Sequence, residues 1–440
     1  MAGETPIAQY LRKQPCFRPS IEEPPAPDLG LVVAIPCKDE PALGETLASL
    51  ARAAAPAIGV EVIVIANASE RDDAEVRARS ALDAREARAF GAAAAAAAAP
   101  IRVHVIEALD LPARHAGVGL ARKLAMDEAA LRLDRVGRPR GVIACLDADC
   151  TVAPSYLVAL AEWFDAHPEA DAAAVHFEHP HEDLADPRHR AAIVGYELFL
   201  RCHVHGLGLA GHPSAIQTVG SSMAVRAVAY ATHGGMNRRQ AGEDFYFLQK
   251  LALHARVGEI RSTTVHPSPR VSSRVPFGTG RAVGEALARE DPSIRGYDPR
   301  VYRVLAELIA RIDRWWASTG DDPLAGLGEV AAPAASFLRD HGLPEALHEM
   351  RANATSLASF RARFFAWLSP FRALKLVHHL TAVAYPRQPI AEVALAILAW
   401  HGVALDLEPL ARSDEEGLLS RFRALDRGDP TLPPSGRERP

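Results

Sequence analysis

The sequence predicts an α/β protein with a parallel β-sheet, followed by a region that is almost entirely helical. Short apolar runs rich in β-branched residues alternate with helical segments between residues 31 and 149. Strands that alternate with helices in this way pair in parallel, and the helices cover both faces of the sheet. After about residue 285 the apolar residues recur at helical spacing as far as residue 425. The length of 440 residues is sufficient for two or three domains.

Four predicted strands open the α/β region, and each of them ends in a polar segment. They are LVVAIP (31–36), VEVIVIANAS (60–69), IRVHVIEAL (101–109) and GVIACLDAD (141–149). A helix is predicted after each of the first three, and the clearest is the amphipathic segment 118–133. The alanine run 91–100 is either an extension of the second helix or a loop insertion. Ligands collect beyond the carboxyl ends of parallel strands, so segments 37–40, 67–72 and 147–149 are expected to converge at one edge.

The pattern is looser after residue 155. DAAAVHFEHPHEDL (171–184) is typical of a strand that runs into a loop, and TVGSSMAVRAVAYATHGG (218–235) of a strand and a short helix. The expected organisation is an extended N-terminal arm rich in Pro and charge, the α/β domain, a helical domain and a disordered tail. The corresponding ranges are 1–28, 29–285, 286–426 and 427–440.

Composition excludes several classes of function. The formal net charge of −5 does not favour a nucleic-acid partner. Five cysteines without a C-x-x-C pair indicate reduced thiols and a cytoplasmic location. No signal peptide is recognisable, and the most apolar late segment, 393–405, is too short to span a bilayer. Segment 359–380 mixes aromatic and basic residues, so peripheral membrane contact stays open, although a core helix is the favoured interpretation.

The end of the fourth strand carries the pattern most suggestive of chemistry. Asp147 and Asp149 are separated by one residue, and alternate residues of an extended chain point the same way. Both carboxylates could therefore face one cation. Hard oxygen ligands in an incomplete set suit Mg²⁺ or Mn²⁺ held in part by the phosphates of a substrate. A plain polar loop is the alternative, because D-x-D often occurs by chance.

Five segments in a fixed order decide between these interpretations. The chain resembles the family 2 glycosyltransferases, which have the GT-A fold, over about residues 30–275. The segments are VVAIPCKDEPALGETLASL, VEVIVIANASERDD, GVGLARKLAMDEAA, CLDADC and HGGMNRRQAGEDFYFLQKLALHARVGEI. The last, in which GGM is followed by GEDFYFLQKL, is the most specific. The resemblance implies a GT-A domain that takes a nucleotide-diphosphate sugar, such as a UDP- or GDP-sugar, as its donor.

The resemblance also assigns roles to residues. Asp149, and less directly Asp147, would hold the cation on the diphosphate, and His266 would complete the metal site. Asp244, with Glu243 beside it, matches the position of the catalytic base. The residues expected to contact the donor are Pro36, Lys38, Glu40, Asn67, Arg122 or Lys123, Asp147, Gly234 and Gly235. Transfer from a diphosphate leaving group requires these two kinds of carboxylate, one for the cation and one for the proton of the acceptor hydroxyl.

The family pattern is not complete. Lys38-Asp39 replaces the usual Tyr-Asn, Asn67 replaces an Asp that commonly reads the base, and Lys123 replaces the Asn of A-R-N. The nucleotide and the acceptor therefore stay open. Arg314-Trp315 lacks the preceding Gln of the processive Q-x-x-R-W motif, so an inverting enzyme that transfers a single sugar is expected.

Two other functions were weighed against this one. A sugar-phosphate nucleotidyltransferase is disfavoured, because PCKDEPALG lacks the basic Gly-rich loop of that class. A third hypothesis is that the protein binds a nucleotide sugar without catalysing its transfer. His176, His179 and His181 fit no strong zinc signature and indicate a polar loop. The basic segment 270–282 is either a loop that closes over phosphate or acceptor, or a linker.

Overall fold

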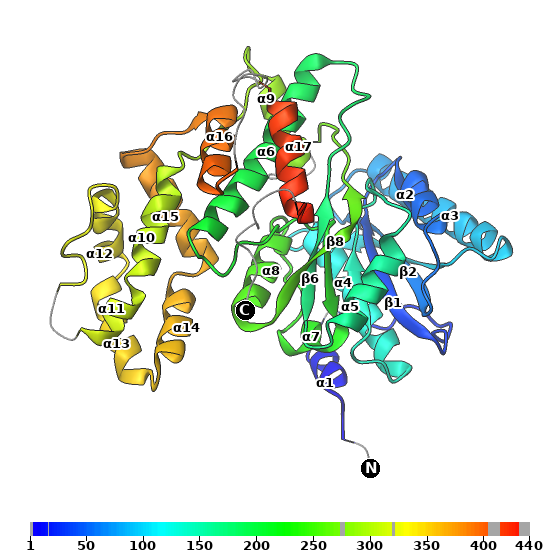
Figure 1. Cartoon of the computed structure of the whole chain (residues 1–440). Coiled ribbons are helices and arrows are strands. Elements are labelled where there is room, and N and C mark those ends of the chain that lie inside the picture. Colours follow the sequence, from blue (N-terminus) through cyan, green and yellow to red (C-terminus); the bar gives the residue numbers. More distant parts are fainter. Residues whose placement is uncertain (1–2, 16, 273–277, 319–321, 404–413, 431–440) are drawn as a thin grey trace. The chain divides into compact units, whose positions relative to one another are not determined.

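A computed structural model describes residues 3–15, 17–272, 278–318, 322–403 and 414–430 (Figure 1). The chain forms two compact units. The first comprises residues 1–180 and 218–282, and the second comprises residues 181–217 together with the chain from residue 283 onward. This differs from the expected domain limits, because residues 181–217 had been placed in the α/β domain.

The first unit is built on a mixed sheet of eight strands among the described residues, in the order β3-β2-β1-β4-β7-β6-β8-β5. The strands are β1 (Leu29–Cys37), β2 (Gly59–Ser69), β3 (Arg102–Leu111), β4 (Val142–Cys145), β5 (Thr151–Val152), β6 (Ala172–Phe177), β7 (Met223–Arg226) and β8 (Val257–His266). Every residue of β1 is buried, as expected for a central strand of a sheet covered on both faces. The predicted α/β class is confirmed.

The direction of the strands is only partly as predicted. β3, β2, β1 and β4 are parallel, in agreement with the strand–helix alternation of residues 31–149. β7 is antiparallel to both β4 and β6, and β5 is antiparallel to β8. The parallel sheet is thus extended by strands that do not follow the regular alternation.

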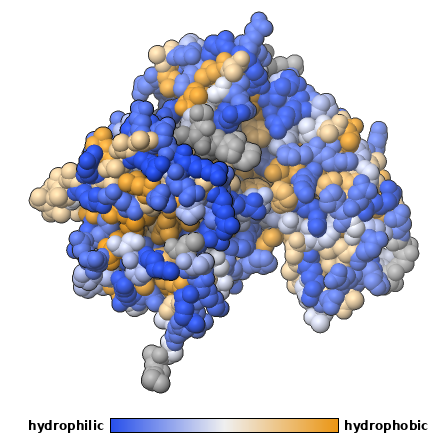
Figure 2. Space-filling model, turned by 180° about the vertical axis from the view of Figure 1, so that it is seen from behind, coloured by the Kyte–Doolittle hydropathy of each residue, from blue (hydrophilic) through white to orange (hydrophobic). Residues whose placement is uncertain are grey.

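Helices flank this sheet (Figure 1). They are α2 (Leu43–Ala51), α3 (Ala74–Ala96), α4 (Val118–Arg135), α5 (Tyr156–Ala166), α7 (Ala227–Thr232) and α8 (Glu243–His254). Asp73 caps α3 by accepting a hydrogen bond from the Val76 amide at 2.8 Å. The alanine run continues α3 as far as Ala96 and forms a mildly apolar projection at its end (Figure 2), so the helix-extension interpretation is correct.

The N-terminal segment is not an extended arm throughout. Residues Pro6–Arg12 form helix α1, in which Ile7, Tyr10 and Leu11 are buried. These residues have the i, i+3, i+4 spacing of one helix face, and Pro6 at the first turn favours the start of a helix. Tyr10 donates a hydrogen bond to Asp127 of α4 at 2.8 Å. The apolar face of α1 therefore docks on the sheet domain. The Pro-rich composition of the segment gave no indication of this helix.

The second unit is helical, as predicted. Its helices are α6 (Pro187–Leu209), α10 (Arg300–Ala310), α11 (Ile312–Ala317), α12 (Ala335–Asp340), α13 (Leu343–Asn353), α14 (Leu357–Trp367), α15 (Pro370–Val383), α16 (Ile390–Trp400) and α17 (Glu415–Arg427). A 3₁₀ turn spans Ala332–Ala334, and a short ladder joins β9 (Arg295–Gly296) to β10 (Gln388–Pro389). Helix α9 (Thr279–Leu287) contains the point at which the chain leaves the first unit.

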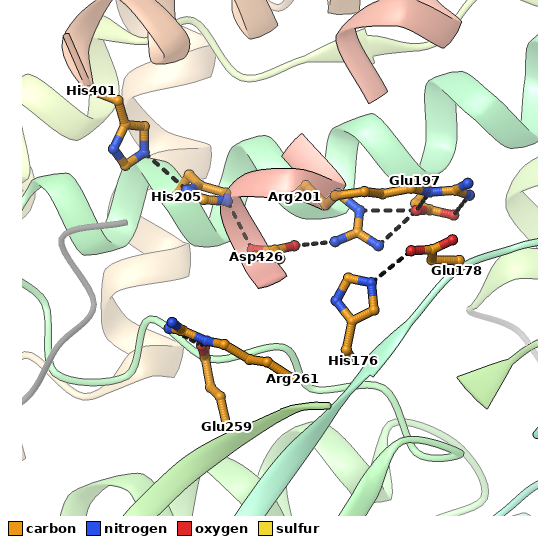
Figure 3. Close-up of polar contacts among 10 residues, drawn as sticks. His176, Glu178, Glu197, Arg201, His205, Glu259, Arg261, His401 and Asp426 are labelled. Atoms are coloured by element: carbon orange, nitrogen blue, oxygen red, sulfur yellow. Dashed lines mark hydrogen bonds and ion pairs between the residues drawn. The ribbon is translucent and has the colours of Figure 1, made fainter. Parts of the chain in front are cut away.

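Buried ionic contacts explain why residues 181–217 belong to the second unit. Glu197 of α6 accepts hydrogen bonds from Arg201 at 2.7 Å and from Arg423 of α17 at 2.8 Å (Figure 3). Asp426 of α17 pairs with Arg201 and with His205, the latter at 3.0 Å. These contacts tie α6 to the C-terminal helix over more than 200 positions of sequence.

Two further expectations concern the ends of the chain and the membrane. The predicted tail lies largely at residues 431–440, outside the described residues, whereas Arg427 is the last residue of α17. Among the helices that the structure describes, none combines the length and apolar character required to cross a bilayer.

Candidate active site

The polar segments that follow β1, β2 and β4 lie at one edge of the sheet, as their parallel pairing requires. One ion pair joins two of these segments directly, and Arg270 bridges two of them. Lys38, after β1, contacts Asp72, after β2, at 2.6 Å. Glu40, after β1, and Asp149, after β4, share the guanidinium of Arg270. The structure thus brings together the three strand ends that the sequence singled out.

Carboxylates crowd the edge near β4. Burial raises the pKa of Asp149 to about 6, and the negative charges of Asp147 and Glu40 act in the same direction. Nη2 of Arg270 lies 3.2 Å from Oδ2 of Asp149 and also contacts Glu40, which opposes the rise. Glu40 was expected to line the nucleoside, but its carboxylate lies on the side of Asp149.

His266 is placed beside the D-x-D segment by the register of the sheet. It ends β8 and pairs with Thr151 of β5, two residues after Asp149. Its Nδ1 lies 3.3 Å from the carbonyl oxygen of Glu178. Within the part of the chain that the structure describes, no three His, Cys, Asp or Glu side chains are close enough to form a metal cluster.

The donor set nevertheless fits a hard divalent cation. Asp149 and Glu40 converge on one cationic nitrogen, so their oxygens already share a position suited to positive charge. Mg²⁺ and Mn²⁺ are commonly held by one or two carboxylates together with water and substrate phosphate oxygens. A preassembled cage of protein ligands is therefore not required.

A second cluster of charge surrounds Arg122 of α4. Its side chain is buried, and its guanidinium contacts both Asp147 and Glu243, the first residue of α8. Its Nε has no partner among the described residues. Arg122 is expected to approach the donor, and in the structure it pairs with the carboxylates on either side.

Glu243 and Asp244 differ in their surroundings. Glu243 is buried against Arg122, and burial raises its pKa while Arg122 lowers it. Asp244 is only half-buried and accepts a hydrogen bond from the Phe245 amide at 2.7 Å. Burial also raises the pKa of Asp244. Of the two residues, Asp244 is the more exposed to solvent.

Gly220 is a site residue that the sequence analysis missed. A Cβ at this position would lie 2.7 Å from Nη1 of Arg122 and 2.8 Å from Oδ2 of Asp244. Only glycine leaves room for both groups, so Gly220 backs the cluster directly. The quoted stretch TVGSSM was interpreted only as the start of a strand, and one glycine gives no signal of such a contact.

The glycines that open α4 serve the same region. A Cβ at Gly119 would overlap the carbonyl oxygen of Arg239, and one at Gly117 would lie 2.8 Å from Cα of Gln240. The loop that precedes α8 therefore packs against the first turn of α4. This contact explains why a glycine-containing helix start and the E-D segment form one site.

Lys123 and Gly235 do not reach this site. Lys123 follows Arg122 on a helix, where neighbouring residues point in different directions. Its Nζ contacts Asp127 at 2.9 Å and the hydroxyl of Tyr10 at 2.5 Å. A Cβ at Gly235 would overlap that hydroxyl, whereas one at Gly234 would meet nothing within 4 Å. Lys123 and Gly235 thus contact Tyr10 of α1, and their expected role at the donor stays a prediction.

The remaining expected donor residues lie at the strand ends. Pro36 is buried in β1, where it pairs with Ile65 of β2. Asn67 is buried near the end of β2, and its carbonyl oxygen accepts a hydrogen bond from Ser80 at 3.2 Å. Lys38 is committed to its ion pair with Asp72.

The three histidines of the HFEHPHED segment have separate partners. His176 lies 2.8 Å from the carboxylate of Glu178, and His179 lies 3.2 Å from the hydroxyl of Thr279. His181 contacts Glu182 at 3.7 Å. All three side chains are buried, and His176 lies within β6 rather than in a loop. Only part of the basic segment 270–282 can be described, because residues 273–277 lie outside the described ranges.

Comparison with known proteins supports the resemblance seen in the motifs. Residues 32–217 match the model of Glycosyl transferase family 2, a range that includes the D-x-D but ends before Gly220 and Asp244. A comparison with curated protein sequences gives no significant match.

Two solved structures illustrate the similarity at low identity. One is S. aureus TarS 1–349 in complex with UDP-GlcNAc, with 12% identity, a TM-score of 0.36 and 92% coverage of each chain. The other is the mannosyltransferase PcManGT from Pyrobaculum calidifontis in complex with GDP-Man and Mn²⁺. It has 14% identity, a TM-score of 0.33 and coverage of 97% of this chain and 95% of that one. The chain is thus similar to glycosyl transferase family 2 over residues 32–217, and the chain beyond the sheet is a helical C-terminal region.

Proposed function

We propose that the protein transfers one sugar from a nucleotide-diphosphate sugar to an acceptor hydroxyl, with inversion at the anomeric carbon and with the help of Mn²⁺ or Mg²⁺. The observation that carries this proposal is the separation of two carboxylate groups. Asp149 and Glu40 lie at the strand ends, while Asp244 lies at the start of α8. Arg122 connects the two groups through Asp147 and Glu243.

The roles of the residues follow from this separation. A divalent cation held by Asp149 and Asp147, with Glu40 and His266 nearby, would offset the charge that develops on the leaving diphosphate. Pro36, Lys38 and Asn67 lie where the nucleoside of a donor is expected at the carboxyl edge of the sheet. Neither a UDP- nor a GDP-sugar is favoured by these residues.

Asp244 is the proposed base. A sugar hydroxyl is a weak nucleophile, so a carboxylate has to accept its proton as the new bond forms. Asp244 is the half-exposed member of the pair, and the raised pKa makes it a stronger proton acceptor than an ordinary aspartate. Glu243 is engaged by Arg122 and serves to hold the arrangement in place. One base without a covalent nucleophile is the requirement of an inverting displacement.

Transfer of a single sugar is favoured over processive synthesis. Arg314 and Trp315 lie on α11 of the helical unit, and the indole nitrogen of Trp315 donates to the carbonyl oxygen of Pro323 at 3.2 Å. Trp315 is buried in the core of that unit. The tryptophan is thus explained by packing, without a role in a polymer channel.

Substitutions and nucleotide binding together test the proposal. Thermal unfolding with UDP, GDP and their sugars, each with Mn²⁺, Mg²⁺ or EDTA, identifies the donor class. A ligand at about 100 times its dissociation constant adds roughly 2.7 kcal/mol to the free energy of unfolding. Asp149→Ala is expected to abolish the metal-dependent shift, while Asp244→Asn is expected to keep it and to stop transfer. Normal turnover by Asp244→Asn would refute the assignment of the base.

A further inference from the structure

The positive charge that lies between the strand ends belongs to the chain itself. One nitrogen of Arg270, Nη2, contacts Oδ2 of Asp149 at 3.2 Å and also contacts Oε2 of Glu40. These two carboxylates come from the segments after β4 and β1. Like charges this close repel each other unless a cation lies between them. Arg270 therefore occupies a position between two oxygens that a divalent cation would also favour.

We propose that the guanidinium of Arg270 takes the place of a divalent metal ion between Asp149 and Glu40. When the metal binds, it displaces Arg270, and the guanidinium moves to the donor. This inference rests on the proposed function, because it takes the donor to carry a diphosphate. The diphosphate offers new partners to the displaced guanidinium, since arginine binds phosphate oxygens through paired hydrogen bonds. Metal and nucleotide diphosphate are then expected to bind cooperatively, each helping the other.

The difference between the two arginines of the site supports this role. The side chain of Arg270 is 32% exposed, so its charge can move into water or onto a ligand at low cost. Arg122, by contrast, is buried between carboxylates on both sides and is fixed there. Arg122 therefore stays in its ion pairs, whereas Arg270 can leave its carboxylate partners for another ligand.

A matched control is available on the same sheet. Arg261 of β8 is 29% exposed and pairs with Glu259 at 2.9 Å, so it resembles Arg270 in charge, exposure and type of partner. Arg261→Gln removes one positive charge from the first unit without touching Asp149 or Glu40. Arg270→Lys keeps the positive charge at this position. Thermal unfolding of each variant checks that the fold is intact.

The experiment is a titration of the full chain with Mn²⁺, in which the free ion is measured by electron paramagnetic resonance. Without nucleotide, Arg270→Gln is expected to bind Mn²⁺ about five- to tenfold more tightly than the wild type, because the charged contacts of Arg270 with Asp149 and Glu40 no longer have to be broken. Arg270→Lys and Arg261→Gln are expected to bind like the wild type. Addition of UDP or GDP is expected to tighten Mn²⁺ binding in the wild type more than in Arg270→Gln.

The outcomes separate this inference from the proposed function. If Mn²⁺ binds to the wild type and binds no more tightly to Arg270→Gln than to Arg261→Gln, the exchange of Arg270 for the metal is refuted and the metal site survives. If Mn²⁺ binds to no variant, with or without nucleotide, both the metal site and the exchange are refuted. Nucleotide-sugar transfer in EDTA then decides whether the transferase function stands without a metal.

Discussion

Replacement of Arg122 is the most direct test of the electrostatic arrangement at the centre of the site. The side chain is buried and contacts Asp147 and Glu243. Arg122→Met removes the positive charge but keeps most of the apolar volume of the side chain. Glu243 is then buried without its counter-ion. Removal of one partner of a buried ion pair costs about 3–5 kcal/mol, and we expect the free energy of unfolding to fall by this amount.

The loss should depend on pH through Glu243. Burial raises the pKa of this carboxyl while Arg122 lowers it, so the pKa rises further when Arg122 is removed. A carboxyl whose pKa is higher in the folded than in the unfolded protein stabilises the fold below its unfolded pKa. This contribution is lost as the pH rises through the folded pKa. The deficit of Arg122→Met is therefore expected to be smaller at about pH 5 than at about pH 8.

Urea unfolding followed by circular dichroism at both pH values measures this effect. Glu243→Gln, alone and combined with Arg122→Met, is the control, because glutamine keeps the shape of glutamate and removes its charge. The second substitution is expected to recover about 1.5–3 kcal/mol of the loss, the coupling energy of adjacent charged groups. A loss below about 1 kcal/mol in Arg122→Met would refute the reasoning. A larger deficit at the lower pH would refute it equally.

Three smaller predictions address other parts of the first unit. A Cβ at Gly220 would lie 2.8 Å from Oδ2 of Asp244, so Gly220→Ala is expected to lower kcat of donor turnover about tenfold or more by displacing the proposed base; an unchanged kcat would contradict the close contact. Tyr10→Phe removes the hydrogen bond to Asp127 and is expected to cost about 1–2 kcal/mol in urea unfolding; wild-type stability would show that α1 is not held by this bond. Asp73→Ala removes the cap of α3 and is expected to lower the free energy of unfolding by about 1 kcal/mol, which thermal unfolding can check against Asp73→Asn.

The sheet could be predicted because its signals are local. The first four strands are short β-branched runs bounded by polar turns, and the segment 118–133 has a clear helical period. Each of these elements can therefore be predicted from its own residues. Local signals say less about where an element packs. Helix α6 joins the second unit because Glu197 and Arg201 meet charges on α17, more than 200 positions away. No periodicity within residues 181–217 carries that information.

The same distinction divides the candidate site. Asp147 and Asp149 were predictable because a strand and its end fix their position. The partners of these carboxylates were not, because Arg122 comes from a helix and Arg270 from a segment 121 positions beyond Asp149. Lys123 stands beside Arg122 in sequence, yet its side chain pairs with Asp127. The motifs were thus enough to predict where the candidate site lies. The contacts of its side chains depend on tertiary packing and were visible only in the structure.

The balance of charge explains why such a site would need both a metal and a mobile arginine. Among the described residues of the site, two guanidinium groups pair with the carboxylates of Glu40, Asp147, Asp149 and Glu243, and Asp244 feels the charge of Arg122. Five carboxylates against two guanidinium groups leave three negative charges when all are ionised. A diphosphate brought into this surplus would be repelled, because charges near a protein interior are poorly screened. A divalent cation at Asp149 would remove most of the surplus and, in the proposed exchange, would free Arg270 for the incoming phosphates. Nucleotide binding in EDTA should therefore be weak in the wild type and should not be rescued by Arg270→Gln, which removes a positive charge without supplying another. Tight metal-free binding of a nucleotide diphosphate by either protein, measured by calorimetry, would mean that the carboxylates do not face the donor.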